Sequence, residues 1–265
     1  MKLSTLILAK NEEEMIEDCL SQLSFADEII ILDQNSTDKT VAIANKFTDK
    51  VFSSKSEALD ESRNELAQKA KGEWLLYVDA DERLTPELVN EIKSIVNGSG
   101  KAGSNVTAAY YIPRRNFILG KWLKHGGWWP DYVPRLFKRE NFPGWQGAIH
   151  ESPKVNGKAG RLNSPINHLT ARSMDLMLTK SAKWAKLEAE LYAKSNAPKV
   201  SQIKVLKFSL KEFVRRYFIK LGFLDGKVGF MAAAYQALHN AMILTYLWEI
   251  QNNTAEKFKN QAEKL

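Results

Sequence analysis

The sequence predicts an α/β fold, with a mostly parallel sheet flanked by helices and a helical extension at its carboxyl end. Three observations predict it. Over roughly the first 100 residues, short runs that are apolar throughout alternate with segments of helical spacing. Several of these runs end in polar residues, as strands beside a ligand site do. From Ser173 onward the helical pattern continues almost to the end of the chain.

The elements can be placed by residue number. The apolar runs predict buried parallel strands at 3–9, 28–32, 51–52 and 74–78. The helical spacing predicts helices at 12–23, 37–47 and 56–71, and another from Thr85, with Pro86 in its first turn. A further strand is expected at 108–113. Residues 116–164 are rich in Trp, Gly, Pro and Arg and predict short strands and loops that form a second wall of the site.

Composition narrows the class of protein. The chain has 265 residues, 44% of them hydrophobic and 26% charged, which is typical of a globular protein. A formal net charge of +7 favours anionic partners, and the single cysteine, Cys19, fits a reducing compartment. The apolar start is too short for a signal peptide, and no uninterrupted apolar run of about 18 residues is present.

The segment after the fourth strand places Asp79, Asp81 and Glu82 within four residues. Such a cluster is costly unless water, a cation or a basic partner neutralises it. Carboxylates at a strand end suit Mg²⁺ or Mn²⁺, particularly when substrate phosphates complete the coordination. The segments 9–11 and 33–35 also follow strands, so we expect all three at one edge of the sheet.

Four segments in matching order and spacing resemble family 2 glycosyltransferases with the Rossmann-like GT-A fold. They are Ala-Lys-Asn-Glu-Glu at 9–13, Leu-Asp-Gln-Asn-Ser-Thr-Asp-Lys-Thr at 32–40, Ser-Arg-Asn at 62–64 and Val-Asp-Ala-Asp-Glu at 78–82. Pro-Arg-Leu-Phe at 134–137, Gly-Ala-Ile-His-Glu at 147–151 and Asn-His at 167–168 further resemble bacterial lipopolysaccharide-core β-glucosyltransferases.

The resemblance implies three regions. Residues 1–115 would be the nucleotide-sugar-binding GT-A half, and residues 116–170 the acceptor side of the same catalytic domain. Residues 171–265 would be a helical region in contact with a membrane. The implied reaction moves a sugar from a nucleotide-sugar to an acceptor hydroxyl, with inversion at the anomeric carbon.

The resemblance also assigns roles at the strand ends. Asp81 would bind the metal directly, and Asp79 would reach the ribose or the metal through water. Asp33 would contact uracil or ribose, its alternative being an Asx-turn aspartate. Glu82 would contribute less, as a cap of the helix that follows it.

Five further residues complete the expected donor site. Ala9 would contribute backbone contacts, and Asn11 and Glu13 lie on the same loop. Arg63 would neutralise diphosphate or bridge to the acidic residues, with a surface ion pair as its alternative. Arg135 would bind diphosphate, with the same alternative.

An inverting transferase needs a base opposite the leaving group. Glu151 is the first candidate and Asp131 the second; the Glu-Asp pair common in the family is absent here. His150 would orient Glu151 or contact phosphate. His168 would be a third metal ligand or a phosphate donor, although a lone histidine is often structural.

Tryptophans are concentrated in the expected second wall. We expect one or two of them to contact acceptor or donor sugar, and core packing to explain the others. They are Trp122, Trp128, Trp129 and Trp145.

The carboxyl-terminal region combines apolar and basic faces. Residues 199–224 carry an apolar helical face beside Lys and Arg, which fits a helix on an anionic membrane or a helix packed on its own domain. Residues 228–250 are apolar but contain Gln236, His239 and Asn240, which favours a packed or interfacial helix.

Three functions are consistent with these features. The first is a Mg²⁺- or Mn²⁺-dependent inverting glycosyltransferase that moves glucose, as the resemblance suggests, from a UDP-sugar to a glycan or glycolipid of the cell envelope. It would act in the cytoplasm at the inner face of the membrane, without nucleic acid. The alternatives are a sugar-phosphate nucleotidyltransferase, although 9–13 lacks the glycine-rich phosphate loop, and a non-catalytic membrane or nucleic-acid adaptor.

Overall fold

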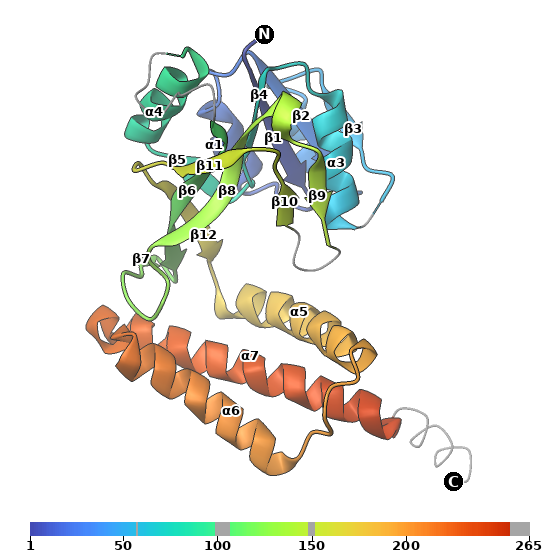
Figure 1. Ribbon diagram of the computed structural model, residues 1–265, viewed down its shortest axis with the longest axis vertical. Coiled ribbons are helices and arrows are strands. Elements are labelled where there is room, and N and C mark those ends of the chain that lie inside the picture. The colour runs from blue at the N-terminus through green and yellow to red at the C-terminus, as the bar shows by residue number, and fades with distance from the viewer. Residues whose placement is uncertain (57, 99–106, 148–151, 255–265) are drawn as a thin grey trace. The chain divides into compact units, whose positions relative to one another are not determined.

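The computed structural model describes residues 1–56, 58–98, 107–147 and 152–254. The chain forms two compact units (Figure 1). Residues 1–116 and 130–170 form the first, which we call the sheet unit. Residues 117–129 and those from 171 onward form the second, which we call the helical unit. The three functional regions expected from the sequence stay a prediction.

Four parallel strands make one half of the main sheet, in the order β3-β2-β1-β4. They are β1 (Leu3–Ala9), β2 (Glu28–Asp33), β3 (Val51–Ser53) and β4 (Trp74–Tyr77). Side chains of a strand alternate between its two faces. In β4, accordingly, Trp74 and Leu76 belong to one hydrophobic cluster, and Leu75 and Tyr77 to another. Burial on both faces explains why these strands are apolar throughout.

Helices cover the two faces of this half. The first cluster packs the strands against α1 (Ile16–Ser21), α2 (Thr40–Ala44) and α4 (Pro86–Val96). The second packs them against α3 (Leu59–Lys69). The first three helical segments are shorter than the sequence pattern suggested, and α4 begins where Thr85 accepts a hydrogen bond from the backbone of Leu88. The predicted fold class, an α/β sheet flanked by helices, is confirmed, and the strands β3, β2, β1 and β4 are parallel as expected.

The other half of the sheet is largely antiparallel. After β4 the order continues β8-β6-β12-β5, with β7 and β11 paired to β6. The strands are β5 (Glu82–Leu84), β6 (Thr107–Ile118), β7 (Lys121–Trp122), β8 (Asp131–Lys138), β11 (Lys158–Arg161) and β12 (Ile166–Ala171). A 3₁₀ turn (Arg139–Asn141) leads to a separate pair, β9 (Gly144–Gln146) and β10 (Ser152–Lys154).

Within its described residues, the helical unit contains the three long helices α5 (Met174–Lys194), α6 (Gln202–Val214) and α7 (Gly226–Asn252) (Figure 1). Ser173 and Ser201 accept hydrogen bonds from the first turns of α5 and α6, the usual role of an N-cap serine. A single helix over 199–224 was expected. Instead, a π-helical turn, η2 (Arg215–Ile219), and a 3₁₀ turn, η3 (Gly222–Asp225), follow α6.

Small residues let α5 and α7 pack closely, since Ala185 and Ala189 of α5 meet Ile243 and Leu247 of α7 in one cluster. Among the residues that the structure describes, no helix is both long and apolar enough to cross a membrane.

Candidate functional site

The carboxyl ends of β1, β2 and β4 meet at one edge of the sheet unit. Ala9 is paired with Asp33 in the β1–β2 register, and its carbonyl oxygen accepts a hydrogen bond of 2.8 Å from the backbone N–H of Gln34. Asp79 follows β4 by two residues. The expected common edge is therefore present, with the loops after all three strands beside one another.

Asn11 and Glu13 hold two of these loops together. The side-chain oxygen of Asn11 accepts a hydrogen bond of 2.8 Å from the backbone N–H of Thr37. Glu13 accepts one of 3.1 Å from the backbone of Lys39, and its own N–H donates to Asp38 at 3.1 Å. Both side chains therefore hold the loop after β2 in position through its backbone.

The two carboxylate oxygens of Asp33 have different surroundings. One carboxylate oxygen, Oδ2, accepts a hydrogen bond of 3.0 Å from the backbone N–H of Ser36, which is the Asx-type turn. The other, Oδ1, is buried and has no hydrogen-bond partner among the described residues. An unsatisfied buried acceptor is costly, so this atom is suited to a donor supplied by a ligand.

A buried ionic cluster occupies the end of β4. The guanidinium of Arg135, on β8, donates to Asp79 Oδ2 and, at 2.6 Å, to Glu82 Oε1. Arg63, on α3, lies 3.4 Å from Asp79 Oδ1. Glu82 is fully buried in β5 and accepts a hydrogen bond of 3.0 Å from the backbone N–H of Asp79. The expectation that Glu82 caps a helix is wrong, because Thr85 takes that position.

Ion pairs shift the pKa values of Asp79 and Arg135 in this cluster. Burial acts to raise the pKa of Asp79, but the charges of Arg135 and Arg63 outweigh it and hold the pKa well below the usual range. Burial likewise acts to lower the pKa of Arg135, while Asp79 and Glu82 raise it. Asp79 and Arg135 are therefore both ionised at neutral pH.

Arg63 is held by aromatic rings as well as by charge. Its guanidinium carbon lies 4.8 Å from the ring centroid of Trp145 and 5.8 Å from that of Tyr77. The next residue, Asn64, exchanges two hydrogen bonds with the backbone of Trp145, at 2.7 and 2.9 Å. The Ser-Arg-Asn segment thus fixes both the arginine and the aromatic surface under it.

A polar cavity of about 200 Å³ opens at this cluster. Three arginines and one aspartate face it. Its lining residues are Arg63, Asp79, Arg114, Val133, Pro134, Arg135 and Trp145. Arginine forks match the oxygens of phosphate groups, so the cavity is suited to an anionic group.

Asp131 lies beside the cavity, at the start of β8. Its Oδ2 accepts hydrogen bonds from Nε and Nη2 of Arg114, at 2.9 and 2.8 Å, and from the side-chain amide of Asn116, at 3.0 Å. Burial acts to raise the pKa of Asp131, but the charge of Arg114 and these hydrogen bonds outweigh it, so the pKa lies below its usual range. Asp131 is ionised at neutral pH but is a correspondingly weak base.

Asn116 also fixes the orientation of His168. Because the amide nitrogen of Asn116 donates to Asp131, its oxygen faces Nδ1 of His168, at 2.7 Å. A neutral imidazole must then donate from Nδ1, which leaves the lone pair of Nε2 directed at Asp81 Oδ2, 3.4 Å away. Two acceptors facing each other need a proton or a cation between them.

The pair Asp81–His168 therefore fits a divalent metal, since carboxylate oxygen and neutral imidazole are ligands that Mn²⁺ accepts. Within the described part of the chain, no group of three or more His, Cys, Asp or Glu side chains is arranged to hold a metal. Water and substrate could supply further ligands to such an ion. Asp79 is engaged by Arg135 and Arg63 and fits direct ligation less well than Asp81.

Several predictions have different outcomes at the second wall. Glu151, the first candidate base, and His150 lie outside the described residues. Trp145 lines the cavity, whereas Trp122, Trp128 and Trp129 belong to the helical unit. Trp122 packs edge-on against Trp129 at 5.5 Å, and Trp128 lies under Arg216 at 5.2 Å.

The sequence reasoning missed Arg114 and Asn116. They lie two residues apart on β6, so their side chains point to the same face of the strand. Two polar side chains at alternate positions of a strand were the signal that could have identified them.

Cys19 lies beneath the site. It is completely buried in α1, with its Sγ 3.6 Å from the carbonyl oxygen of Asp79. Burial raises the pKa of its thiol to about 12. Cys19 is therefore a packing residue at neutral pH.

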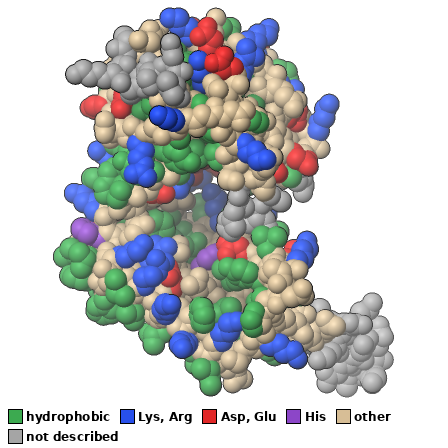
Figure 2. Space-filling model, viewed as in Figure 1, with side chains coloured by type: hydrophobic (Ala, Val, Ile, Leu, Met, Phe, Trp, Pro, Cys, Tyr) green, Lys and Arg blue, Asp and Glu red, His purple; other side chains and the backbone are tan. Residues whose placement is uncertain are grey.

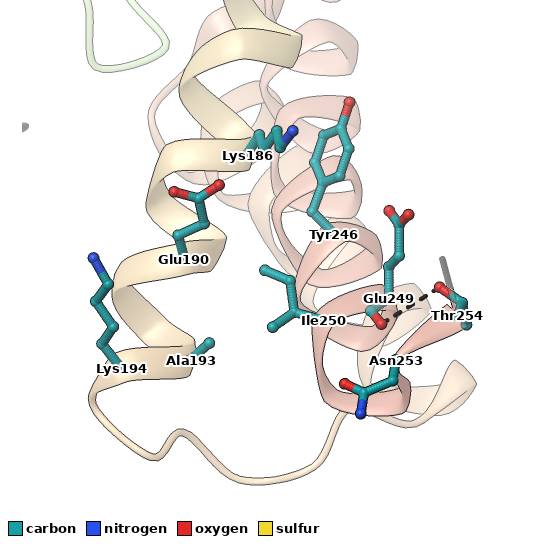
Figure 3. Close-up of a pocket in the computed structure, with 9 residues that line it drawn as sticks. All are labelled: Lys186, Glu190, Ala193, Lys194, Tyr246, Glu249, Ile250, Asn253 and Thr254. Atoms are coloured by element: carbon teal, nitrogen blue, oxygen red, sulfur yellow. Dashed lines mark hydrogen bonds between the residues drawn. The ribbon is translucent and has the colours of Figure 1, made fainter. Parts of the chain in front are cut away.

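A cavity of about 580 Å³ lies between α5 and α7 (Figure 3). Although it is larger than the cavity at β4, its lining contains none of the strand-end residues. It is formed by Lys186, Glu190, Ala193, Lys194, Tyr246, Glu249, Ile250, Asn253 and Thr254. Its charged side chains of both signs are typical of a solvated helix surface, so the chemistry is better sought at β4.

Comparisons with known proteins identify the family. The family model described as "Glycosyl transferase family 2" matches residues 4–153, more than half of the chain. An uncharacterized glycosyltransferase of Rickettsia conorii is 26% identical over 268 residues, covering 94% of this chain and 90% of the relative. LpsC of Rhizobium meliloti, a lipopolysaccharide core biosynthesis glycosyltransferase, is 25% identical and covers 74% of this chain and 73% of its own length.

Solved structures were compared as well. TarS of S. aureus in complex with UDP-GlcNAc covers 97% of this chain and 92% of its own, with 14% identity and a TM-score of 0.45. Glucosyl-3-phosphoglycerate synthase of Mycobacterium tuberculosis with Mn²⁺ and UDP-glucose covers 75% and 80%, with 18% identity and a TM-score of 0.45.

Proposed function

The chain belongs to glycosyl transferase family 2, and on that premise we propose that it is a metal-dependent, inverting glycosyltransferase that uses a UDP-sugar. The observation that carries the proposal is the strand-end cavity, which three arginines and Asp79 line, together with the Asp81–His168 pair that begins two residues after Asp79. Family membership favours this function over the two alternatives, a nucleotidyltransferase and a non-catalytic adaptor.

The donor would lie along the strand ends. Asp33 Oδ1, buried and without a partner among the described residues, would accept a hydrogen bond from uracil or ribose. Asn11 and Glu13 would hold the loop that carries it, next to Ala9. Arg63 and Arg135 would attract the diphosphate, and Asp79 would keep both guanidinium groups in position.

Asp81 and His168 would hold Mg²⁺ or Mn²⁺, with Asp79 as a more distant partner. The ion would offset the negative charge that develops on the departing diphosphate. The arginines of the cavity act in the same direction, and they are already oriented by their ion pairs. Such preorganised charge stabilises a transition state more than water does.

The acceptor hydroxyl must lose a proton as the new bond forms on the face opposite the diphosphate. Asp131 is the candidate within the described structure. Its hydrogen bonds with the described residues Arg114 and Asn116 end on Oδ2, so Oδ1 would accept the proton. Glu151 is the other candidate, and the two can be separated by substitution.

We propose glucose as the sugar and a glycan or glycolipid of the cell envelope as the acceptor. The similarity to LpsC of Rhizobium meliloti, a lipopolysaccharide core enzyme by its name, supports this assignment. The proposed location is the cytoplasmic face of the inner membrane, with the chain bound peripherally. No nucleic-acid partner is expected.

Titration calorimetry with UDP-glucose and other nucleotide-sugars, with and without Mn²⁺, tests the proposal. We expect metal-dependent binding, and Asp81→Asn should lower turnover at least about 100-fold with folding unchanged. Asp18→Asn, which changes a carboxylate that is 79% exposed, is the matched control. The proposal fails if no nucleotide-sugar binds in a metal-dependent manner.

The base is tested by comparing Asp131→Asn with Glu151→Gln. The variant that lacks the base should lose transfer to the acceptor but still bind the donor with the wild-type affinity. If both variants transfer sugar at the wild-type rate, neither residue is the base.

A further inference from the structure

The helix α6 carries an apolar stripe that the fold leaves uncovered. None of its residues, Gln202–Val214, is buried, although the structure describes all of them. Ile203, Leu206 and Leu210 are 77%, 72% and 64% exposed. Their spacing of three and four residues places them on one side of the helix. A packed amphipathic helix buries such a stripe, so α6 presents it outward.

The stripe continues into a second apolar group where α6 ends. We call this group the apolar tip; its members, all exposed, are Phe218, Ile219, Leu221, Phe223 and Leu224. Leu221 adopts φ of 56°, a left-handed conformation that is unfavourable for leucine. Strained residues of this kind persist only where the surrounding structure enforces them.

Close backbone packing holds the apolar tip in this conformation. A Cβ on Gly222 would lie 2.7 Å from the carbonyl oxygen of Arg216, and one on Gly229 would collide with the carbonyl oxygen of Gly222. The π-helical turn η2 precedes this crossing. The fold thus uses a π turn, a strained leucine and two glycines to form a turn whose large side chains face solvent.

Positive charge surrounds both groups. Residues 195–248 contain eight Lys or Arg and only two acidic residues, Glu212 and Asp225. Glu212 is bound by Arg215 at 2.5 Å and Arg216 at 2.6 Å, and Asp225 is buried and accepts a hydrogen bond of 2.8 Å from the backbone of His125. Neither carboxylate opposes an approaching anionic surface.

The remaining lysines lie where an interface would need them. Lys207 and Lys211 follow Leu206 and Leu210 directly and are exposed along one edge of the stripe. Lys220 is exposed within the tip. Basic and hydrophobic side chains are mixed over the visible face of the helical unit (Figure 2). Long lysine stems can keep their charge at headgroup level while neighbouring apolar side chains enter the lipid.

We propose that the stripe of α6 and the apolar tip form a docking surface for a lipid bilayer that contains anionic headgroups. This proposal specifies which residues would bind the membrane at the peripheral location given above, and it rests on the proposed function. The combination of exposed Ile, Leu and Phe with exposed lysines favours a membrane, because the partner must accept both apolar side chains and positive charge. A second copy of this chain would bring the same positive charge to the interface.

Flotation of the full chain with lipid vesicles tests the surface. Wild type should bind vesicles containing phosphatidylglycerol at least tenfold more tightly than vesicles of phosphatidylcholine alone. Ile219→Asn with Leu224→Gln should weaken binding about tenfold or more, through lost apolar burial. Lys207→Gln with Lys211→Gln should weaken binding only to the anionic vesicles.

Matched substitutions make the test specific. Leu178→Gln on α5 changes an apolar side chain that is 38% exposed, and Lys154→Gln with Lys158→Gln removes two exposed lysines of the sheet unit. These controls should bind vesicles as wild type does. Equal losses in controls and test variants, or no binding by wild type, would overturn the proposal.

Light scattering tests the other possibility, that a second copy of this chain covers the surface. A dimer without lipid that Ile219→Asn with Leu224→Gln converts to monomer would assign the surface to a second copy and overturn the membrane proposal. Metal-dependent binding of UDP-sugar is measured on the same samples without vesicles. If the donor binds but vesicles do not, only the docking surface is wrong; if vesicles bind but no donor does, only the proposed activity is wrong.

Discussion

The sheet unit and the helical unit treat charge and apolar surface in opposite ways. In the sheet unit, Arg135 and Glu82 are buried and paired, and the apolar strands are covered on both faces. In the helical unit, the apolar side chains of α6 are exposed and lysines surround them. The sheet unit thus buries its apolar side chains together with some of its charges, whereas the helical unit leaves the apolar side chains of α6 exposed.

Removing the buried cation Arg135 should have the largest effect on the difference between the two units. Arg135→Met should destabilise the protein by about 3–5 kcal/mol, because Glu82 would keep a buried charge without its partner. Urea denaturation measures the effect. Arg139→Met, which changes an exposed arginine on the following turn, is the control and should change stability by less than about 0.5 kcal/mol.

One substitution made in both units sharpens the comparison. Leu76→Ala in β4, where the side chain is fully buried, should cost about 2–5 kcal/mol through lost burial and a cavity. Leu206→Ala in α6, where it is 72% exposed, should change stability by no more than about 0.5 kcal/mol. Similar losses in the two variants would mean that α6 is packed in solution.

Low pH should lower the stability of the sheet unit, because Asp79 becomes protonated. Its pKa in the folded state lies below the ordinary value of 3.8, so it contributes stability that is present above that pH and is lost as the pH falls below it. Between about pH 5 and pH 2, the free energy of unfolding of wild type should fall by about 2 kcal/mol more than that of Asp79→Asn.

Denaturation at several pH values measures this difference. Asp49→Asn, which removes an exposed carboxylate, is the matched variant. Parallel profiles for wild type and Asp79→Asn would show that the ion pairs of Asp79 add no stability.

The smallest effect concerns Asn116. Asn116→Ala frees the ring of His168, so we expect the affinity for Mn²⁺ to fall about tenfold, as when other partners that orient a metal ligand are removed. Electron paramagnetic resonance of unbound Mn²⁺ measures this without turnover. Asn163→Ala, at an exposed position, should leave the affinity unchanged.

The parallel half of the fold could be predicted because its signal is local. Burial on both faces makes β1 and β4 apolar from end to end, and β1 was expected at its observed bounds, Leu3–Ala9. Thr85 and Ser173 likewise marked helix starts through their own side chains. The match of the family model confirms the resemblance to family 2 glycosyltransferases.

The antiparallel half carried less local signal. β5 has only three residues, and Glu82 within it is polar, so nothing in its sequence indicates a buried strand. Its burial depends on Arg135, 53 residues later in the chain, and Arg114 depends in the same way on Asp131. Ion pairs between strands that are far apart in the chain follow no periodic pattern, so the sequence alone does not indicate them. The roles proposed for the individual site residues stay predictions.

The single buried thiol has a practical consequence. Cys19 is protonated at neutral pH and out of contact with solvent, so alkylating reagents should not reach it in the folded protein. A cysteine introduced at Ile219 or Lys207 would then be the only site that takes up a fluorophore or spin label. The natural sequence is thus already a background for single-site spectroscopy, in which probe depth and mobility can be followed as vesicles are added.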